Sequence, residues 1–196
     1  MELSEEALLN ETEVVRRAHL GDPSAWESVI QLHQEPVFRF AYLLLGDAAE
    51  AEDIAQETFL RAYRAFARFD PERALRPWLL SISANLARNR RRSLGRYRSA
   101  LSRFFQANER LEPGIEERSA RREENQVVLR AIHRLSERDR QVIYLRYFLE
   151  LSVDEVAQTA GVASGTVKSR LHRSLKRLKN VIEQELPEYR MDLDDG

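Results

Sequence analysis

The sequence predicts an all-α protein of two small helical domains joined by a linker, the C-terminal domain being a helix-turn-helix. The helix-forming residues Ala, Leu, Arg and Glu are abundant along its 196 residues. Only seven Gly and six Pro are present, too few for a turn-rich all-β fold. Apolar residues recur at helical spacing in two stretches that an aperiodic segment separates. We assign residues 1–94 to the first domain, 95–115 to the linker, 116–186 to the second domain and 187–196 to a tail.

The first domain opens with a helix predicted over residues 11–20, which ends at a Gly-Asp-Pro turn. Ser24, with Glu27 three residues later, predicts a capping box for the next helix. Pro36 favours the start of a new helix, because proline is tolerated in a first turn.

A further amphipathic helix is predicted over residues 49–66. The sequence FDPER at 69–73 indicates a turn, and a helix that follows Pro77 is expected to end near residue 94. Its core-facing residues are Leu79, Ile82 and Leu86, and those of the 49–66 helix are Ile54, Phe59, Leu60, Tyr63 and Phe66.

The second domain begins with a helix whose apolar face carries Ile132 and Leu135. Ser136 with Asp139, and Ser152 with Glu155, predict the N-terminal caps of the next two helices. The last helix starts at about Ser164, after the turn at Gly161. Its apolar face is predicted from Val167, Leu171, either Ser174 or Leu175, and Leu178.

Composition excludes several classes of site. Without Cys the chain can form no disulfide, thiolate zinc site or cysteine nucleophile. The four His are scattered, and His33 is expected to pack at a helix interface. No apolar run approaches the ~20 residues of a membrane span, and the acidic N-terminus does not resemble a signal peptide. No nucleophile–base set or phosphate loop stands out either, so we expect a non-enzymatic protein with no catalytic residue, metal or cofactor. Without a membrane span or signal peptide, we expect it to be cytoplasmic, with no membrane insertion.

Two basic segments lie behind the formal net charge of −1. Residues 85–103 hold seven Arg and no acid, and residues 164–182 hold six Lys or Arg and no acid. Two such segments in a near-neutral chain indicate two anion-facing surfaces. The alternative, for either segment alone, is a solvated Arg-rich helix end.

Residues 151–178 (LSVDEVAQTAGVASGTVKSRLHRSLKRL) have the form of a helix-turn-helix. Ala157, Gly161, Val162, Val167 and Leu171 fit the buried positions. Small hydroxyl residues near a helix N-terminus can approach phosphates, and Arg can reach guanine edges or phosphates. A helical hairpin that packs on protein is the alternative. The residues expected to face DNA are Ser164, Thr166, Lys168, Ser169, Arg170, His172 and Arg173.

The first domain resembles the second conserved region of extracytoplasmic-function (ECF) sigma factors in four segments: EDIAQETFLRAY at 52–63, FDP at 69–71, RPWLL at 76–80 and NLARNRRR at 85–92. The helix-turn-helix resembles their fourth region, in the expected order. The resemblance covers residues 20–94 and 120–180. It implies a sigma factor that binds core RNA polymerase, recognises the −35 and −10 promoter elements and helps to open the promoter.

The resemblance also implies which residues do this. The polymerase partners are the clamp helices of its largest subunit and the flap region, and an anti-sigma factor is a further expected partner. Leu75 stands where the family often has Phe, which affects the base preference of the loop. Trp78 is assigned either to a wedge beside opened DNA or to packing. The polymerase-binding residues are Asp53, Gln56, Glu57, Phe59 and Arg61, the −10 residues are Phe69, Arg76, Trp78, Asn85, Arg88, Arg91 and Arg92, and the −35 residues are those of the helix-turn-helix face above.

Two other functions stay open at this point. A sigma-like decoy would bind an anti-sigma factor and never engage DNA, although it would have little need of the Arg run. A helix-turn-helix transcription regulator acting without polymerase would use the N-terminal helices for dimerisation or sensing.

Overall fold

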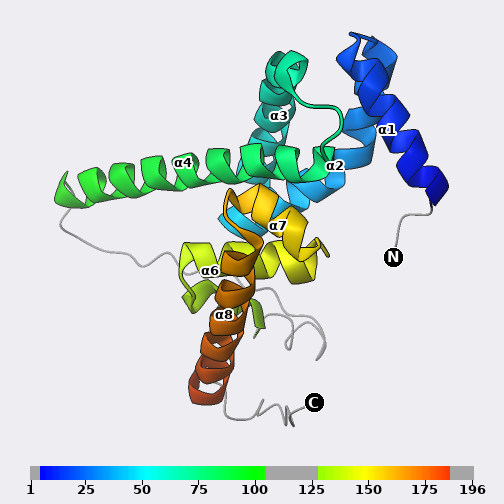
Figure 1. Cartoon of the computed structure of the whole chain (residues 1–196). Helices are drawn as coiled ribbons and strands as arrows, with labels where there is room; N and C mark the ends of the chain where they lie inside the picture. Colours follow the sequence, from blue (N-terminus) through cyan, green and yellow to red (C-terminus); the bar gives the residue numbers. More distant parts are fainter. Residues whose placement is uncertain (1–4, 105–127, 186–196) are drawn as a thin grey trace, which may run out of the picture.

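The computed structural model describes residues 5–104 and 128–185, and within them it contains helices and no strand, as predicted (Figure 1). The predicted linker beyond residue 104, the start of the second domain up to residue 127 and the tail lie outside the described residues. None of the described helices is long and apolar enough to cross a bilayer.

Four helices and a short 3-10 turn form the N-terminal unit. The central helix α2 packs against the other three helices, and α4 is the longest of them (Figure 1). The elements are α1 (Glu5–His19), α2 (Pro23–Leu45), α3 (Ala48–Ala65), η1 (Phe66–Arg68) and α4 (Leu75–Phe104).

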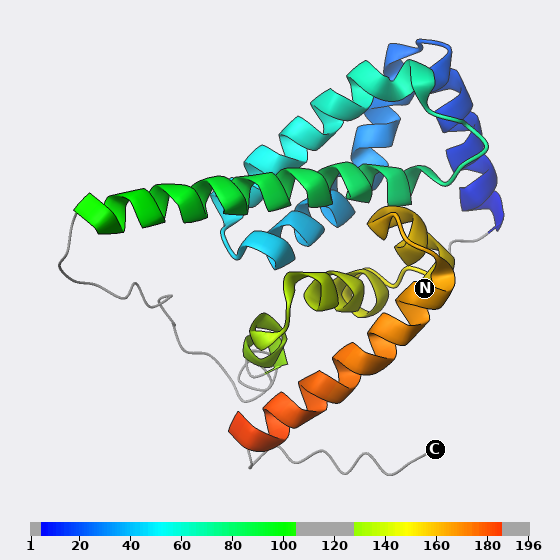
Figure 2. The ribbon, with the colours of Figure 1, turned by 60° about the vertical axis from the view of Figure 1, so that its left-hand side comes forward.

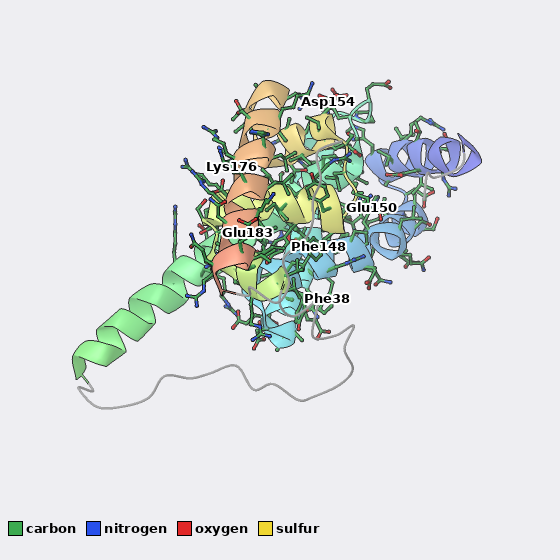
Figure 3. The ribbon with its side chains drawn as sticks, turned by 90° about the horizontal axis from the view of Figure 1, so that it is seen from below. Phe38, Phe148, Glu150, Asp154, Lys176 and Glu183 are labelled. Carbon is green, nitrogen blue, oxygen red and sulfur yellow. The ribbon has the colours of Figure 1, made fainter. Side chains whose placement is uncertain are left out.

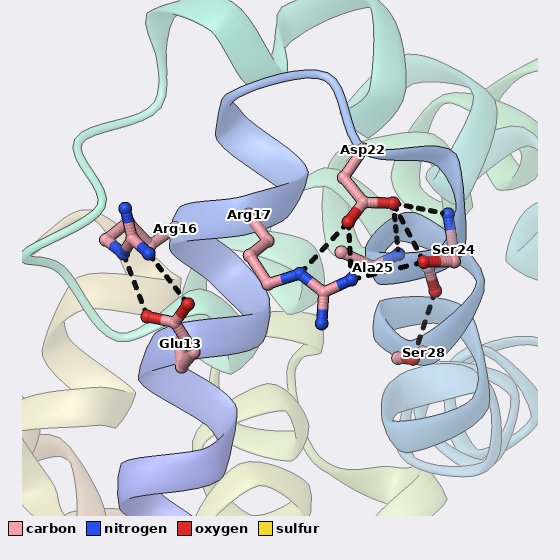
Figure 4. Close-up of polar contacts among 7 residues, drawn as sticks. All are labelled: Glu13, Arg16, Arg17, Asp22, Ser24, Ala25 and Ser28. Atoms are coloured by element: carbon pink, nitrogen blue, oxygen red, sulfur yellow. Dashed lines mark hydrogen bonds and ion pairs between the residues drawn. The ribbon is translucent and has the colours of Figure 1, made fainter.

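The N-terminal cap of α2 is Asp22, so the prediction that Ser24 caps this helix was wrong. Asp22 Oδ1 accepts from the backbone N–H of Ser24 (2.9 Å) and from its hydroxyl (2.8 Å), which places Ser24 inside the first turn (Figure 4). Arg17 Nε donates to the other carboxylate oxygen at 3.0 Å. The hydrogen bond from Ser24 and the Arg17 guanidinium lower the pKa of Asp22 to about 2. The sequence pattern misleads because Asp, Pro and Ser all favour helix starts, and Pro23 takes the N1 position.

Pro36 lies inside α2 and does not begin a new helix, which corrects the prediction for this residue. An interior proline removes one helical hydrogen bond and crowds the preceding turn. Helix α2 continues because both halves bury residues in the same core: Val29 and His33 before the proline, Val37 and Phe40 after it. Tertiary packing therefore outweighs the local preference.

Helix α4 continues to Phe104, ten residues beyond the predicted end of the first domain, so the linker does not start at residue 95. Gly95, the first residue of the predicted linker, lies inside the helix. A single glycine costs a helix only about 1 kcal/mol relative to alanine, and the surrounding Arg, Leu and Ala residues favour a helix. The first helix also differs, since α1 begins six residues before the predicted start at residue 11.

The C-terminal unit contains a helical segment at 128–134, α6 (Glu137–Ile143), the π-helical turn η2 (Tyr144–Phe148), α7 (Val153–Ala160) and α8 (Ser164–Glu185). Both predicted caps are confirmed. The Ser136 hydroxyl accepts from the Asp139 N–H at 3.3 Å. The box at Ser152 and Glu155 is reciprocal, with bonds of 2.8 and 3.2 Å. Gly161 ends α7 with a φ of 65°, a conformation that favours glycine.

The two units pack against each other around α4. Helix α4 contacts α7, and α2 contacts η2 (Figure 2). Buried side chains of both units form one contiguous cluster, with Phe40 and Leu79 from the first unit and Tyr144 and Val156 from the second. Figure 3 shows Phe148 and Glu150 at the side of the second unit that lies against α2. The main hydrophobic core therefore runs through both units, and a smaller cluster of Ala41, Ala51, Ile54 and Leu86 lies apart from it in the first unit.

Candidate functional site

The polar face of α3 carries the residues predicted to bind polymerase. Asp53, Gln56 and Arg61 are exposed, and Glu57 is half-buried. Arg61 Nε donates to Glu57 Oε1 at 2.6 Å, and Arg90 of α4 donates to Asp53 at 3.1 Å. Phe59 differs from these four because its side chain is buried in the core.

A groove between α2 and α3 borders this polar face, and sequence reasoning missed it. Leu60 and Tyr63 were predicted to be buried but are 53% and 63% exposed. Both line the groove together with Trp26, Ile30 and Phe38. Trp26 and Tyr63 pack with their ring centroids 5.3 Å apart. The sequence did contain a signal for this groove. The apolar residues of 49–66 are spaced by three, four and five residues, so they spread over more of the helix surface than a single buried face can cover.

The Arg-rich part of α4 holds Asn85 and the predicted phosphate contacts. Asn85 and Arg92 are exposed, and Arg88 and Arg91 are half-buried. Arg88 Nη1 donates to Asn85 Oδ1 at 3.1 Å. Arg90 is bound to Glu50 and Asp53, whose carboxylates raise its pKa, Glu50 the more. The arginines of this basic segment therefore do not share one role: Arg90 binds α4 to α3, whereas Arg88, Arg91 and Arg92 do not contact these carboxylates.

The loop before α4 buries the aromatic residue predicted to contact DNA. Phe69 is 6% exposed, stacks on Phe66 with centroids 5.5 Å apart and lies 4.7 Å from the Trp78 ring. Trp78 is half-buried, and its ring lies against both Phe66 and Phe69. Leu75, at the position where Phe is frequent, is buried.

Arg76 lies at the contact between the two units. Its Nη2 donates to the Leu149 carbonyl at 2.8 Å, and its Nε is buried without a hydrogen-bond partner among the described residues. This side chain, predicted to face DNA, is instead half-buried between the two units. Sequence reasoning could not find its partner, which lies 73 residues away.

The helix-turn-helix presents the predicted DNA face on α8. Thr166, Lys168, Ser169, His172 and Arg173 are exposed, whereas Ser164 and Arg170 are half-buried. The hydroxyl of Ser164 donates to Asp154 at 2.6 Å, and that of Ser169 to the Thr166 carbonyl at 3.1 Å. Lys176, further along α8, is exposed as well (Figure 3).

The opposite face of α8 docks on α6 and α7. Val167 and Leu171 are buried as predicted, and Ser174, not Leu175, takes the next buried position. Gly161, predicted to be buried, is exposed at the turn. Leu175 is 39% exposed. Serine is small enough to let α8 approach its neighbour closely.

An ion pair between Arg177 and the buried carboxylate of Asp139 holds α8 against α6. Arg177 Nη1 lies 2.5 Å from Asp139 Oδ2, and the Asp139 side chain is only 7% exposed. Burial raises the pKa of Asp139, but its hydrogen bonds and the charge of Arg177 outweigh that effect and lower it. Arg177 therefore positions the helix, and sequence reasoning counted it only among the basic residues. Among the described residues, no group of His, Cys, Asp and Glu could hold a metal ion.

Comparison with known proteins agrees with this architecture. Residues 29–97 match the family Sigma-70 region 2, and residues 125–178 match Sigma-70, region 4. The structure is similar to that of CnrH in complex with the cytosolic domain of CnrY (TM-score 0.68, 24% identity, 89% of this chain and 98% of the other). It is also similar to the sigma factor RpoE in complex with the anti-sigma factor NepR from Bartonella quintana (TM-score 0.63, 25% identity, 80% and 96%).

Curated relatives cover nearly the whole chain. The ECF RNA polymerase sigma factor SigW of Bacillus subtilis is 31% identical, over 84% of this chain and 92% of its own length. SigL of Mycobacterium tuberculosis is 35% identical, over 87% and 96%. The matched regions contain α3, most of α4 and the helix-turn-helix, in the order that the sequence predicts. The chain therefore belongs to the sigma-70 family, as a sigma factor of the ECF group.

Proposed function

We propose that this sigma factor binds core RNA polymerase through α3, reads the −35 element with α8 and captures the opened −10 element with α4. The observation that carries the proposal is the division of α8 into two faces. One face is anchored on α6 and α7 by Val167 and Leu171. The other offers cations and hydroxyls to the solvent, the combination that contacts phosphates and base edges in a major groove.

The −35 face consists of Thr166, Lys168, Ser169, Arg170 and Arg173, with Ser164 and His172 at its margin. A single helix of this kind buries on the order of 600–1,000 Å² of protein surface on DNA, which gives modest specificity. Tethering a second reader to the same polymerase makes its contact effectively intramolecular. Two modest contacts then suffice to select a promoter.

The −10 face is assigned to Asn85, with Arg88, Arg91 and Arg92 on backbone phosphates. Flipping one base out of the stack costs a few kcal/mol, which a polar side chain and stacking surface can offset without nucleotide hydrolysis. The burial of Phe69 supports a positioning role for it, under Trp78. Arg76 would join the DNA contacts only after release from Leu149.

The polymerase surface is assigned to Asp53, Gln56, Glu57 and Arg61, extended by the groove that Leu60 and Tyr63 line. Polar groups beside exposed aromatic and aliphatic side chains are typical of protein interfaces. An anti-sigma factor is the second protein partner that we infer, because the similar RpoE structure contains one. The flap region of polymerase is assigned to the C-terminal unit.

Reconstitution tests the proposal. Purified chain is combined with bacterial core polymerase and genomic fragments, and run-off transcripts are mapped. We expect new start sites that share upstream elements and depend on this chain. Binding to core without new start sites would indicate the decoy, and a DNA footprint without polymerase would indicate an independent regulator. Either result would overturn the proposal.

A further inference from the structure

The C-terminal end of α4 extends away from the other helices of the described chain (Figure 1, Figure 3). This helix runs from Leu75 to Phe104. We propose that its end, from Arg92 onward, is a further DNA-binding surface, which contacts the phosphates of duplex DNA directly upstream of the opened −10 element. The inference rests on the proposed function, because it takes Asn85 as the residue that captures the flipped base.

Contacts on one side of α4 fix which side of the helix faces the solvent. Leu86 packs in the small apolar cluster that α4 shares with α2 and α3. One turn later, Arg90 Nη2 donates to Asp53 of α3 at 3.1 Å. Asn85 and Arg92, which stand on the other side of the helix, are exposed. Because α4 is continuous, the same helical register holds to its end.

Arginines continue the line of Asn85 and Arg92 toward the end of α4. Positions 85, 88, 92, 96 and 103 follow one another at steps of three, four, four and seven residues, which places them in one line along a helix. Arg occupies the last four of these positions, and residues 85–103 contain no acid. Arginines four residues apart repel each other. A polyanion bound along the line relieves that repulsion, which an apolar partner does not.

The length and direction of this line suit duplex DNA. From Asn85 to Arg103 the helix rises about 27 Å, at about 1.5 Å per residue, which equals about eight base pairs at about 3.4 Å each. The C-terminal end of α4 leads along the chain toward the unit assigned to the −35 element, so we place this end upstream. Positions 96 and 103 then lie about five and eight base pairs upstream of the captured base.

Fork-junction DNA tests this surface in the holoenzyme. The chain is combined with core polymerase, and two labelled fragments are made from a promoter mapped in the reconstitution. Both carry the −10 element with its single-stranded part, and both lack the −35 element. Upstream of the captured base, the duplex of the short fragment has about two base pairs and that of the long fragment about twelve, so only the long one spans the end of α4.

Three variants are compared on both fragments. Arg96→Gln and Arg103→Gln each remove one charge from the line. Arg98→Gln is the matched control, because it removes the same charge two residues from position 96 and outside the line. Glutamine keeps a helix propensity close to that of arginine, and circular dichroism verifies that each variant is folded.

We expect the native holoenzyme to bind the long fragment more tightly than the short one. Arg96→Gln and Arg103→Gln should each weaken binding of the long fragment by roughly three- to eightfold at about 0.1 M salt, and lower its salt slope by about 0.9, the contribution of one phosphate contact. Neither should affect the short fragment, and Arg98→Gln should bind both fragments as the native chain does.

Equal binding of the two fragments by the native holoenzyme would overturn the inference, as would a loss in Arg98→Gln as large as that in Arg96→Gln. Loss of core polymerase from Arg96→Gln in co-purification would also overturn it, and would assign the end of α4 to a protein partner. A native holoenzyme that binds neither fragment would contradict the proposed function itself.

Discussion

Replacing Arg177 by Met tests whether an ion pair positions α8, the helix proposed to read the −35 element. Arg177 is 59% exposed, whereas its partner Asp139 is 7% exposed, so removing the arginine leaves a nearly buried carboxylate without its cation. Methionine retains the length and apolar stem of the side chain. The change therefore removes the charge while keeping most of the packing.

The expected loss follows from that geometry. A hydrogen bond to a charged group contributes about 1.5–3 kcal/mol when shielded, and water around the exposed Arg177 lowers this to about 1–2 kcal/mol at pH 7. For a chain of this size, such a loss lowers Tm by roughly 2–8 °C. The pKa of Asp139 lies below its ordinary value of 3.8. Its stabilising contribution is therefore complete above that value and is lost as the pH falls through the lowered pKa.

Urea denaturation followed by circular dichroism measures the effect. Lys176→Met is the matched control, because Lys176 is the exposed neighbour on α8 and carries the same charge. We expect Arg177→Met to be less stable than Lys176→Met at pH 7, by a difference that narrows below pH 3.8. Equal stability of the two variants, or a difference that does not change with pH, would refute the assigned role of Arg177.

Three further results are expected. Arg170→Ala should weaken −35 recognition by on the order of tenfold, in line with the 1–3 kcal/mol of a good base contact, without loss of polymerase in co-purification. Asn85→Ala should reduce open complexes more than closed ones, and unchanged permanganate reactivity would contradict the base-capture assignment. Gly161→Ala should cost about 1–2 kcal/mol of unfolding free energy in urea titration, because its φ is 65° while an added Cβ meets nothing within 4 Å. Gly165→Ala, in a helix with equal space, should instead be neutral or stabilising, and similar losses at both glycines would be inconsistent with backbone strain.

Local patterns predicted most of the second unit. Ser136, Ser152 and Glu155 cap helices as expected, since a cap depends only on residues within one turn. The prediction of the α2 N-cap was wrong because Asp22 and Ser24 both have side chains that can cap a helix. Only the folded turn selects Asp22. Pro36 failed because the energy that keeps α2 continuous comes from burial in the core, which no local pattern records.

Some site residues could be predicted from local sequence patterns, and others could not. Exposure of Thr166, Lys168 and Arg173 follows from helical period once Val167 and Leu171 are buried. The groove beside Leu60 and Tyr63 could not be predicted in this way. Helical period shows which residues share a face, but not whether a neighbouring helix covers that face.

By itself, the sequence determined the helical class, the order of the two sigma regions and the polar face of α8. These properties depend on residue types and on spacings of a few residues. The tertiary structure alone decided that Arg76, Arg88 and Arg91 meet Leu149 and Glu137, and that Arg177 meets Asp139. The physical reason is that a charge acts on whatever lies within a few ångströms in space, and such partners are separated here by 38 to 73 residues of chain.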